Sequence, residues 1–358
     1  MDPNTAIDWI PAGQHHSFDD LVFWHGKGSA PFAARAAQID TIVLGPHAGA
    51  RFPAELRPFV AGGLTRRKQY DFSDVITSPL GRAWAAADPG VVFIECPHAR
   101  VVLDPNRAPP QDALASLGAF FDRLHRQRAG EPIGFAGVDA IRPITFSGES
   151  VLREPADEAG WSALGNALTS ARRLGHDAYR SACDEVIHTV LDARPTSAAL
   201  WVVGLHDTMN TKMRADGALV VERPSADRLP ALVNFGNRGD ARGDALTQPL
   251  TLPGADMRRV ADTWAHAFGI APAARAEAIS LNHPYPGGYE VVHYGGLLAQ
   301  RGRPSVGAYQ VEFLRETLLG PRATAHLHQP GGDWPAVDVA HLAGIVGALA
   351  EAGRLLRT

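Results

Sequence analysis

The sequence is poor in cysteine and in lysine. Its 358 residues include only two cysteines, Cys96 and Cys183, and nearly all of the 34 basic residues are arginines. Two cysteines cannot form the disulfide framework of a small secreted protein, so a reducing, cytoplasmic location is expected. The scarcity of lysine indicates a coding bias rather than a functional feature.

Long charged runs and long apolar runs are also missing. The net charge is −4, and the longest charge block is Arg66-Arg67-Lys68. This balance gives no electrostatic support for a nucleic-acid or membrane partner. The longest apolar stretches, such as Leu200 to Leu205, have the length of a strand rather than of a membrane span. The polar start, Met1 to Thr5, does not have the pattern of a signal peptide.

Hydrophobic residues make up 45% of the sequence, enough for a large buried core. Short apolar runs predict strands at 41–44, 91–95, 101–103, 200–204 and 307–314. Longer runs with helical periodicity predict helices at 110–128, 158–193, 254–268 and 337–356. Alternation of this kind predicts an α/β fold of three layers, with a mixed, mostly parallel central sheet flanked by helices.

No repeat or low-complexity linker divides the chain, so we expect one domain over residues 1–358. Residues 1–39 are expected to be an irregular N-terminal segment. Residues 135–155 have no periodic pattern and are interpreted as an insertion. Residues 233–253, rich in glycine and aspartate, predict a loop.

Two of the predicted strands lead into a histidine. The run Thr41–Gly45 is followed by Pro46-His47, and the run from Ala199 by Leu205-His206. Ligands of open α/β sheets bind beyond the carboxyl ends of strands. A single histidine there is most simply a surface-loop residue. Two in one sheet also fit a Zn²⁺ site, because histidine is the commonest metal ligand.

Glu312 stands in an otherwise apolar stretch, where strand alternation places it on the same face as Gln310. A carboxylate in a central strand is costly to bury unless it is paired or catalytic. A half-exposed edge strand is the alternative interpretation.

Two further segments carry polar side chains. Arg100 to Arg107 contains guanidinium groups suited to binding a carboxylate, or to a structural ion pair with Asp104. The segment Asn282 to Tyr289 predicts a fixed turn whose backbone amides approach a ligand, or a purely structural turn.

In order and spacing, these segments resemble the N-formylglutamate amidohydrolase family over residues 40–320. No motif is decisive alone, but the chain has five in order. They are Pro46-His47-Ala48-Gly49, Arg100 with Asp104-Pro105-Asn106-Arg107, Leu205-His206-Asp207-Thr208-Met209, the segment from Asn282 to Gly295, and Gln310-Val311-Glu312.

The resemblance implies a fold similar to that of zinc carboxypeptidases and aspartoacylases. It implies one Zn²⁺ held by His47, His206 and a carboxylate, with Glu312 as the general base and Arg107 in a catalytic role. The residues expected to contact the substrate are Arg100, Asn106, Arg107, Tyr285, Gly287, Gly288 and Tyr289.

The third ligand departs from the carboxypeptidase pattern. Carboxypeptidases have a glutamate three residues after the first histidine, where this chain has Ala50. The family usually has an aspartate about twenty residues further on, so Asp71 is the expected ligand, with Asp74 and Glu55 as alternatives.

Two other residues are expected near the site. Asp207 replaces a serine of the family motif and is expected to lie behind His206. His176 shares a helical face with Tyr179 and is expected to line the site.

The resemblance implies a metal-dependent amidohydrolase acting on a small molecule, an N-acyl and most simply an N-formyl amino acid or related carboxylate. Such chemistry needs a base and a stabiliser of the oxyanion. The alternatives are a carboxypeptidase- or aspartoacylase-like deacylase of another N-acyl substrate, and a non-catalytic binder of small carboxylates on the same fold.

Overall fold

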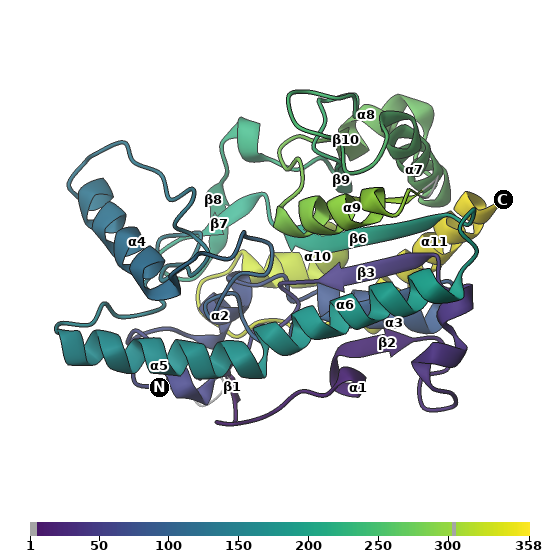
Figure 1. Ribbon diagram of the computed structural model, residues 1–358. Coiled ribbons are helices and arrows are strands. Elements are labelled where there is room, and N and C mark those ends of the chain that lie inside the picture. Colours follow the sequence, from purple (N-terminus) through teal and green to yellow (C-terminus); the bar gives the residue numbers. More distant parts are fainter. Residues whose placement is uncertain (1–5, 303–305) are drawn as a thin grey trace.

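A computed structural model describes residues 6–302 and 306–358, so the N-terminal stretch Met1 to Thr5 lies outside the described residues. Its centre is a seven-stranded sheet (Figure 1). The strands are β2 (Val22–Trp24), β3 (Thr41–Gly45), β5 (Val91–Glu95), β6 (Leu200–Thr208), β9 (Val233–Gly236), β10 (Ile279–Leu281) and β11 (Val306–Leu314). Their order is β10-β9-β11-β6-β3-β5-β2, and all neighbours are parallel except β11–β9 and β2–β5. The expected mixed, mostly parallel sheet is confirmed.

Helices cover both faces of this sheet (Figure 1). One face packs against α3 (Thr77–Ala87), α7 (Gly254–Ala267), α10 (Arg315–Leu327) and α11 (Val339–Arg357). The other packs against α1 (Phe18–Leu21), α6 (His176–Ala193) and α9 (Tyr289–Gln300). Successive strand residues alternate between the two cores: Val203 belongs to the first and Val202 to the second. The three-layer arrangement is therefore confirmed.

A third hydrophobic cluster lies beside the sheet. It contains side chains of α4 (Ala113–Arg128) and α5 (Glu158–Leu174), together with residues of the segment 135–155. That segment contains no helix or strand and makes only isolated bridges, such as Ile144 with Ser150. Two short helices remain, α2 (Arg66–Asp71) and α8 (Arg275–Ala278). Two small strand pairs lie outside the main sheet: β1 (Trp9–Ile10) with β4 (Phe52–Pro53), and β7 (Thr211–Met213) with β8 (Leu219–Glu222). Short 3-10 helices are found at Phe32–Ala34, Ala36–Gln38, Ala54–Leu56, Ser225–Asp227 and Pro272–Ala274.

Several boundaries differ from the sequence prediction. Residues 101–103 form a turn rather than a strand, and their apolar side chains are buried in the third cluster. The helix expected over 158–193 is two helices, because the backbone of Gly175 between them is not helical (φ −120°, ψ −63°). A side chain at this position would meet the ring of His98, which lies 2.3 Å from where a Cβ would stand. The loop expected over 233–253 begins with strand β9, and the N-terminal segment contributes β2 to the sheet. How the chain divides into domains stays a prediction.

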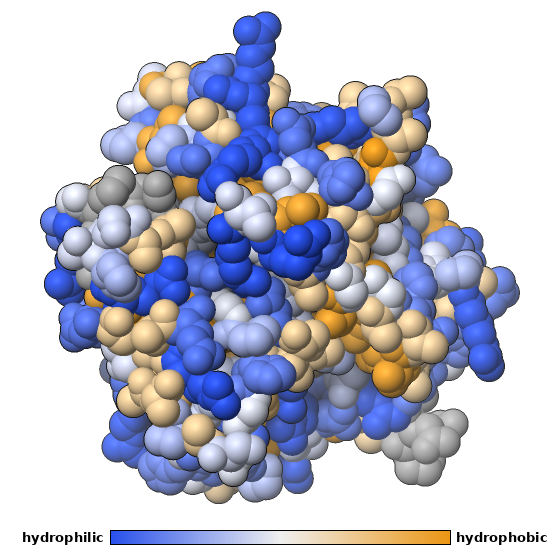
Figure 2. All heavy atoms as spheres, turned by 90° about the vertical axis from the view of Figure 1, so that its right-hand side faces the viewer, coloured by the Kyte–Doolittle hydropathy of each residue, from blue (hydrophilic) through white to orange (hydrophobic). Residues whose placement is uncertain are grey.

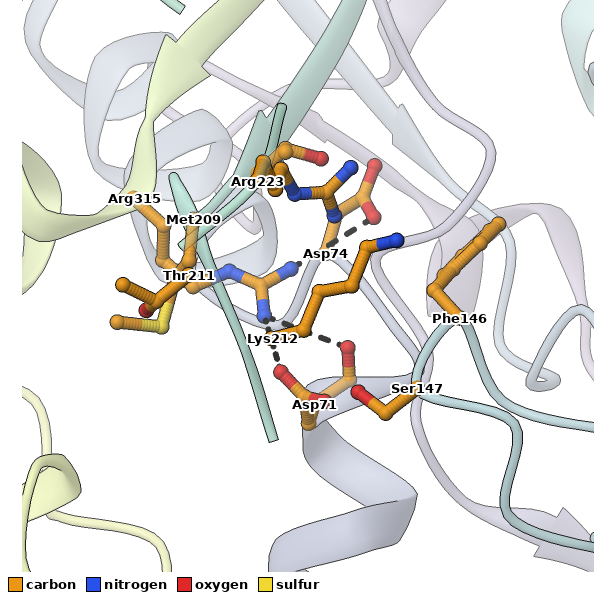
Figure 3. A pocket seen from close by; sticks show the side chains of 10 residues that line it. Asp71, Asp74, Phe146, Ser147, Met209, Thr211, Lys212, Arg223 and Arg315 are labelled. Carbon is orange, nitrogen blue, oxygen red and sulfur yellow. Dashed lines mark hydrogen bonds and ion pairs between the residues drawn. The ribbon is translucent and has the colours of Figure 1, made fainter. Parts of the chain in front are cut away.

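The connection between α2 and α3 is fastened to the sheet by Arg315, the first residue of α10. Its Nη2 donates to the carbonyl of Ser73 at 2.7 Å, and its Nε pairs with Asp207 of β6. Figure 3 shows the same guanidinium reaching Asp71 and Asp74, at 3.7 and 3.9 Å. Burial raises the pKa of Asp207 to about 7, although Arg315 opposes the shift. Because a buried guanidinium needs partners, this network fixes the position of residues 71–74.

One helix among the described residues, α11, is long and apolar enough to cross a membrane by length and composition. Its side chains Leu342, Ile345 and Leu349 are buried in the core that α3 and α7 share. Figure 2 shows the face of the molecule on which the C-terminal end of α11 lies, where hydrophilic side chains predominate and hydrophobic ones form small groups. One buried face is typical of an amphipathic helix that packs on the core of a globular protein. A cytoplasmic location stays a prediction.

Two helical glycines provide a matched test of how closely α3 packs on the sheet. A Cβ at Gly81 of α3 would lie 2.4 Å from the ring of Phe93 on β5, whereas a Cβ at Gly118 of α4 would meet nothing within 4 Å. Alanine is favoured over glycine in helices by roughly 0.5–1 kcal/mol, and overpacking costs roughly 1–3 kcal/mol. In urea unfolding we expect Gly118→Ala to raise the free energy of unfolding and Gly81→Ala to lower it. Equal stabilisation by both substitutions would contradict the close contact of α3 with β5.

Candidate functional site

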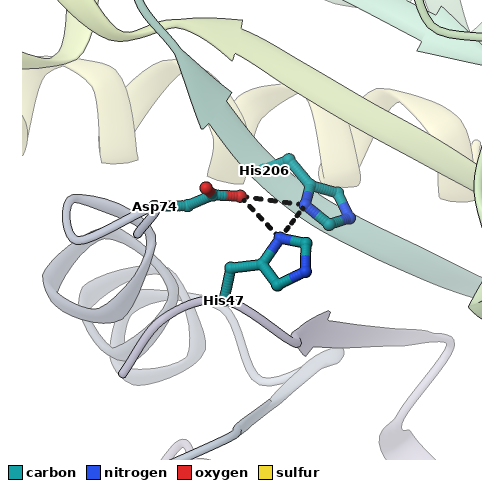
Figure 4. A group of neighbouring side chains, drawn as sticks. All are labelled: His47, Asp74 and His206. Carbon is teal, nitrogen blue, oxygen red and sulfur yellow. Dashed lines mark hydrogen bonds and ion pairs between the residues drawn. The ribbon is translucent and has the colours of Figure 1, made fainter. Parts of the chain in front are cut away.

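Three buried side chains meet beyond the carboxyl ends of β3 and β6: His47, Asp74 and His206 (Figure 4). His47 follows β3, and His206 lies near the end of the neighbouring parallel strand β6. Their Nδ1 atoms are 3.1 Å apart, and Oδ2 of Asp74 lies 3.1 Å from the first and 2.9 Å from the second. The ring centroids are 4.9 Å apart. The parallel pairing of the two strands brings the histidines together.

This group has the chemistry of a metal site. One ligand atom from each residue lies within 4.8 Å of the others, so the three could hold a metal ion. Bonds of ~2.0–2.1 Å at tetrahedral angles would separate the ligand atoms by ~3.3 Å, close to the spacing found here. Two imidazoles and one carboxylate are also a donor set of catalytic zinc sites, in which a fourth position stays open. The residues present therefore fit a divalent ion.

Asp104 orients the first imidazole. Its carboxylate accepts hydrogen bonds from Nε2 of His47 at 2.7 Å, from the amide of Asn106 at 2.8 Å, and from Nε and Nη2 of Arg100 at 3.1 and 2.5 Å. Because Nε2 donates to Asp104, the neutral form of His47 has its lone pair on Nδ1, which faces Asp74 and His206. Burial and Arg100 oppose protonation of His47, but Asp104 and Asp74 outweigh them and raise its pKa. Arg100 thus forms an ion pair with Asp104, which was one of the two interpretations of this segment from the sequence.

Asn106 holds the second imidazole. Its Nδ2 lies 3.3 Å from Nε2 of His206 and 3.3 Å from Oε1 of Gln310. Its side-chain oxygen accepts from the amide of Glu290 at 3.1 Å, and its carbonyl accepts from the amide of Tyr289 at 3.2 Å. Asn106 is therefore fixed between the first turn of α9 and His206. One loop, residues 104–106, contacts both histidines from outside the cluster.

Glu312 faces the same cavity from the next strand. It is the register partner of His206 across the β11–β6 pair, and its Oε2 accepts from Nε2 of Gln310 at 3.0 Å. The interior strand β11 pairs with β6 on one side and with β9 on the other, so the edge-strand alternative is wrong. Burial raises the pKa of Glu312. A carboxylate with a raised pKa beside two imidazoles is a candidate proton acceptor.

A cavity of about 120 Å³ opens beside the cluster. Its lining combines the metal-site candidates with three arginines and several hydrogen-bonding side chains. The lining residues are His47, Asp74, Arg100, Asn106, Arg107, Phe146, His206, Thr208, Arg223, Tyr285, Gln310 and Glu312. A smaller cleft of about 20 Å³ shares Asp74, Phe146, Thr208 and Arg223 with it.

Comparison with known proteins identifies the family. The family model of N-formylglutamate amidohydrolase matches residues 39–319, which is most of the chain. The chain belongs to the N-formylglutamate amidohydrolase family. The predicted resemblance is thereby confirmed, and the family is one of hydrolases that act on amides of small molecules.

No curated protein matches the sequence. The solved structures that resemble it at low identity include the following two. The first is the N-formylglutamate amidohydrolase from Ralstonia eutropha JMP134, with 18% identity and a TM-score of 0.45, covering 89% of this chain and 94% of that one. The second is a gene product of Agrobacterium tumefaciens, with 15% identity and a TM-score of 0.47, covering 90% and 92%.

The third carboxylate of the cluster is Asp74, and the expectation of Asp71 is corrected. Asp71 is the last residue of α2, and its carboxylate lies towards Arg315. Three residues later, the amide of Asp74 donates to the carbonyl of His47 at 3.0 Å, which places the Asp74 carboxylate against the histidines. Burial would raise the pKa of Asp74, but the two imidazoles lower it well below its ordinary value. Glu55 lies elsewhere and accepts from the amide of Gly13 at 2.7 Å.

The segment 282–289 contributes Tyr285 to the cavity lining of this family member, but not Gly287, Gly288 or Tyr289, among the residues that the structure describes. The expected contact of these residues with the substrate stays a prediction, and the amides of Gly288 and Tyr289 already have partners within the protein. The amide of Gly288 donates to Oε1 of Gln310 at 2.9 Å, and that of Tyr289 donates to Asn106. The segment therefore leads into helix α9 and fixes the cavity wall from behind.

Asp207 and His176 lie outside the cavity lining as described. Asp207 points to the opposite face of β6 from His206 and pairs with Arg315, so it lies behind the cluster, as expected. His176 begins α6, with its Nδ1 3.1 Å from Asp177, and burial lowers its pKa to about 4. His176 is therefore not among the described residues that line this cavity, and its role at the site stays a prediction.

Four lining residues had no assigned role in the sequence: Phe146, Thr208, Arg223 and Gln310. The sequence provided an indication for Gln310 and Thr208. Each stands two residues from an expected site residue on the same strand, Glu312 or His206, and therefore lies on the same face of the sheet. Phe146 and Arg223 carried none, since they lie in an irregular segment and after a short hairpin strand.

The assignment of the third ligand can be tested with a matched pair of variants. We expect Asp74→Asn to weaken Zn²⁺ binding by more than roughly 100-fold, because it removes a carboxylate oxygen from the cluster. Asp71→Asn should change the affinity less than roughly tenfold, since Asp71 is not in the cluster. The measurement is a competition titration against a chelator, with circular dichroism as a check of folding. The reverse order of effects would contradict the placement of Asp74.

Proposed function

We propose that this protein is a metal-dependent amidohydrolase that cleaves the amide bond of an N-acyl amino acid, with N-formyl amino acids as preferred substrates. Membership of the N-formylglutamate amidohydrolase family supports amide hydrolysis. The observation that carries the proposal is the buried group His47–Asp74–His206 facing Glu312 across one small cavity. Ligand donors and a separate buried carboxylate are what a metal-assisted hydrolase requires.

The donor set fits Zn²⁺, which would be held by Nδ1 of His47, Nδ1 of His206 and Oδ2 of Asp74. Such an ion, when bound, supplies Lewis-acid chemistry that polarises a carbonyl and makes water a stronger acid. Asp104 keeps His47 in the tautomer that this role needs. Burial of all three ligands keeps bulk water away from the site.

Glu312 acts as the general base in this proposal. It accepts the proton of the attacking water and returns it to the nitrogen that leaves, so the same carboxylate serves both steps. The hydrogen bond from Gln310 holds the carboxylate in place. Its raised pKa brings proton uptake and release closer to neutral pH.

Arg107 stabilises the developing oxyanion in this proposal. Asp139 holds its Nε at 2.8 Å, and its Nη1 donates to the carbonyl of Asn106 at 3.2 Å, so the guanidinium is fixed while it lines the cavity. A preorganised cation costs no reorientation when negative charge develops. Arg100 binds Asp104 through two nitrogens, so we assign it to holding His47 rather than to the substrate.

Membership of the N-formylglutamate amidohydrolase family favours formyl as the acyl group. A deacylase of another N-acyl substrate is the second candidate, since the same three ligands and Glu312 would serve it. Rates on N-formyl, N-acetyl and N-succinyl glutamate and on a dipeptide separate the two candidates.

Removal of the metal should abolish turnover. Dialysis against a chelator should lower the rate of N-formylglutamate hydrolysis by at least roughly 100-fold, because the polarising ion is lost, and Zn²⁺ should restore it. The rate is measured by release of formate, with tryptophan fluorescence as the check that the protein stays folded. Full activity in metal-free protein would refute the proposal.

Glu312→Gln should lower kcat by roughly 10²–10⁴-fold, because the amide cannot accept the proton. Zn²⁺ content should be unchanged, since Glu312 is not in the ligand group. Glu316→Gln is the matched control: Glu316 is a partly buried glutamate that binds the amide of Asn210 outside the cavity. Unchanged turnover in Glu312→Gln would remove Glu312 from the mechanism and would favour a different base.

A further inference from the structure

The three arginines that line the cavity differ in what they bind. Arg100 is paired with Asp104, and Arg107 is paired with Asp139. No ion pair of Arg223 is found among the described residues. In Figure 3, dashed lines join Arg315 to Asp71 and Asp74, but none reaches Arg223. A positive charge without a carboxylate partner, at the wall of a small cavity, is a candidate binding group for an anion.

The surroundings of Arg223 point to a ligand. Its Nε is buried and has no hydrogen-bond partner within the described part of the chain, and its Nη1 lies 3.4 Å from the hydroxyl of Tyr285. The guanidinium lines the cavity, so an anionic ligand there can supply hydrogen-bond acceptors to it. Burial raises the pKa of Tyr285 to about 12, so the hydroxyl remains protonated and can donate beside the guanidinium.

The backbone at Arg223 is fixed. Arg223 follows strand β8, and its amide donates to the carbonyl of Asn210 at 2.9 Å, which closes the base of the β7–β8 hairpin. The residue lies where the main cavity and the smaller cleft meet, on the wall that also contains Thr208 and Phe146. It is outside the five motifs that carry the family resemblance.

This inference rests on the proposed function. We propose that Arg223, with the Tyr285 hydroxyl beside it, binds one carboxylate of the N-acyl amino acid and so determines the preference for substrates that carry that carboxylate. The guanidinium lines the cavity, and its planar group of nitrogens can bind both oxygens of one carboxylate, a contact that lysine cannot reproduce. Arg107, already held by Asp139, remains available for the oxyanion.

The test compares three substrates in which one carboxylate is changed at a time: N-formyl-L-glutamate, N-formyl-L-glutamine, and N-formyl-L-glutamate with an amidated α-carboxyl group. We expect Arg223→Met to raise KM for N-formylglutamate by roughly 10- to 100-fold, because the substrate loses a charge-assisted hydrogen-bonded pair. The value of kcat should be nearly unchanged. The analogue lacking the carboxylate that Arg223 binds should be hydrolysed equally well by variant and wild type. Arg223→Lys should recover only part of the loss.

Arg214→Met is the matched control. Arg214 is an exposed arginine of the same hairpin that pairs with Asp216, so its replacement removes one positive charge without changing the cavity. We expect its KM values to equal those of the wild type. An equal loss on all three substrates in Arg223→Met, or no loss at all, would overturn the proposal.

Calorimetric titration with L-glutamate and with L-glutamine separates this inference from the proposed function. It measures carboxylate binding without turnover. If the wild type binds L-glutamate and Arg223→Met binds it at least roughly tenfold more weakly, Arg223 binds the carboxylate even if no N-formyl substrate is hydrolysed. If both proteins bind it equally, or neither binds it, the proposal fails while amide hydrolysis can still be tested separately.

Discussion

The hydrogen bond from His47 to Asp104 is the interaction on which the rest of the site depends. Asp104 is buried, and a buried carboxylate is stable only when donors surround it. It receives them from Arg100, from the amide of Asn106 and from His47. Removal of any one of these donors would leave the buried charge of Asp104 incompletely paired. The three donors are therefore held in place by the same carboxylate. The result is an imidazole whose Nδ1 has one orientation, towards Asp74 and His206.

The sheet explains why three of the expected site residues lie together. His47, His206 and Glu312 belong to or follow β3, β6 and β11, which are parallel neighbours, so their carboxyl ends meet at one edge. Apolar runs reveal such strands, and a polar residue at the end of a run is visible in the sequence. The third carboxylate is different. Asp71 and Asp74 stand three residues apart, and the choice depends on contacts with Arg315 and with the His47 carbonyl, both distant in sequence.

Two differences between the sequence prediction and the structure share a physical cause. Residues 101–103 are apolar because they are buried in the third cluster, and a short apolar run does not distinguish a strand from a buried turn. The segment 282–289 has glycines and prolines typical of a ligand-binding turn, yet its amides satisfy Asn106 and Gln310 at the start of α9. The local sequence indicates that backbone amides lie outside regular secondary structure and need hydrogen-bond partners. Whether these partners are protein groups or a ligand depends on the tertiary fold.

The cavity is therefore built from two kinds of structure. The sheet and the 104–106 loop hold the groups proposed for chemistry, whereas Phe146 and Arg223 come from the segment 135–155 and from the β7–β8 hairpin. These two outer segments contact each other, since the amide of Met213 donates to the hydroxyl of Ser147 at 2.9 Å. Because neither outer segment forms a strand of the seven-stranded sheet, the wall they make can change while His47, Asp74 and His206 keep their positions. Phe146 and Arg223 had no periodic signal in the sequence because Phe146 lies in a turn and Arg223 lies in a loop after β8.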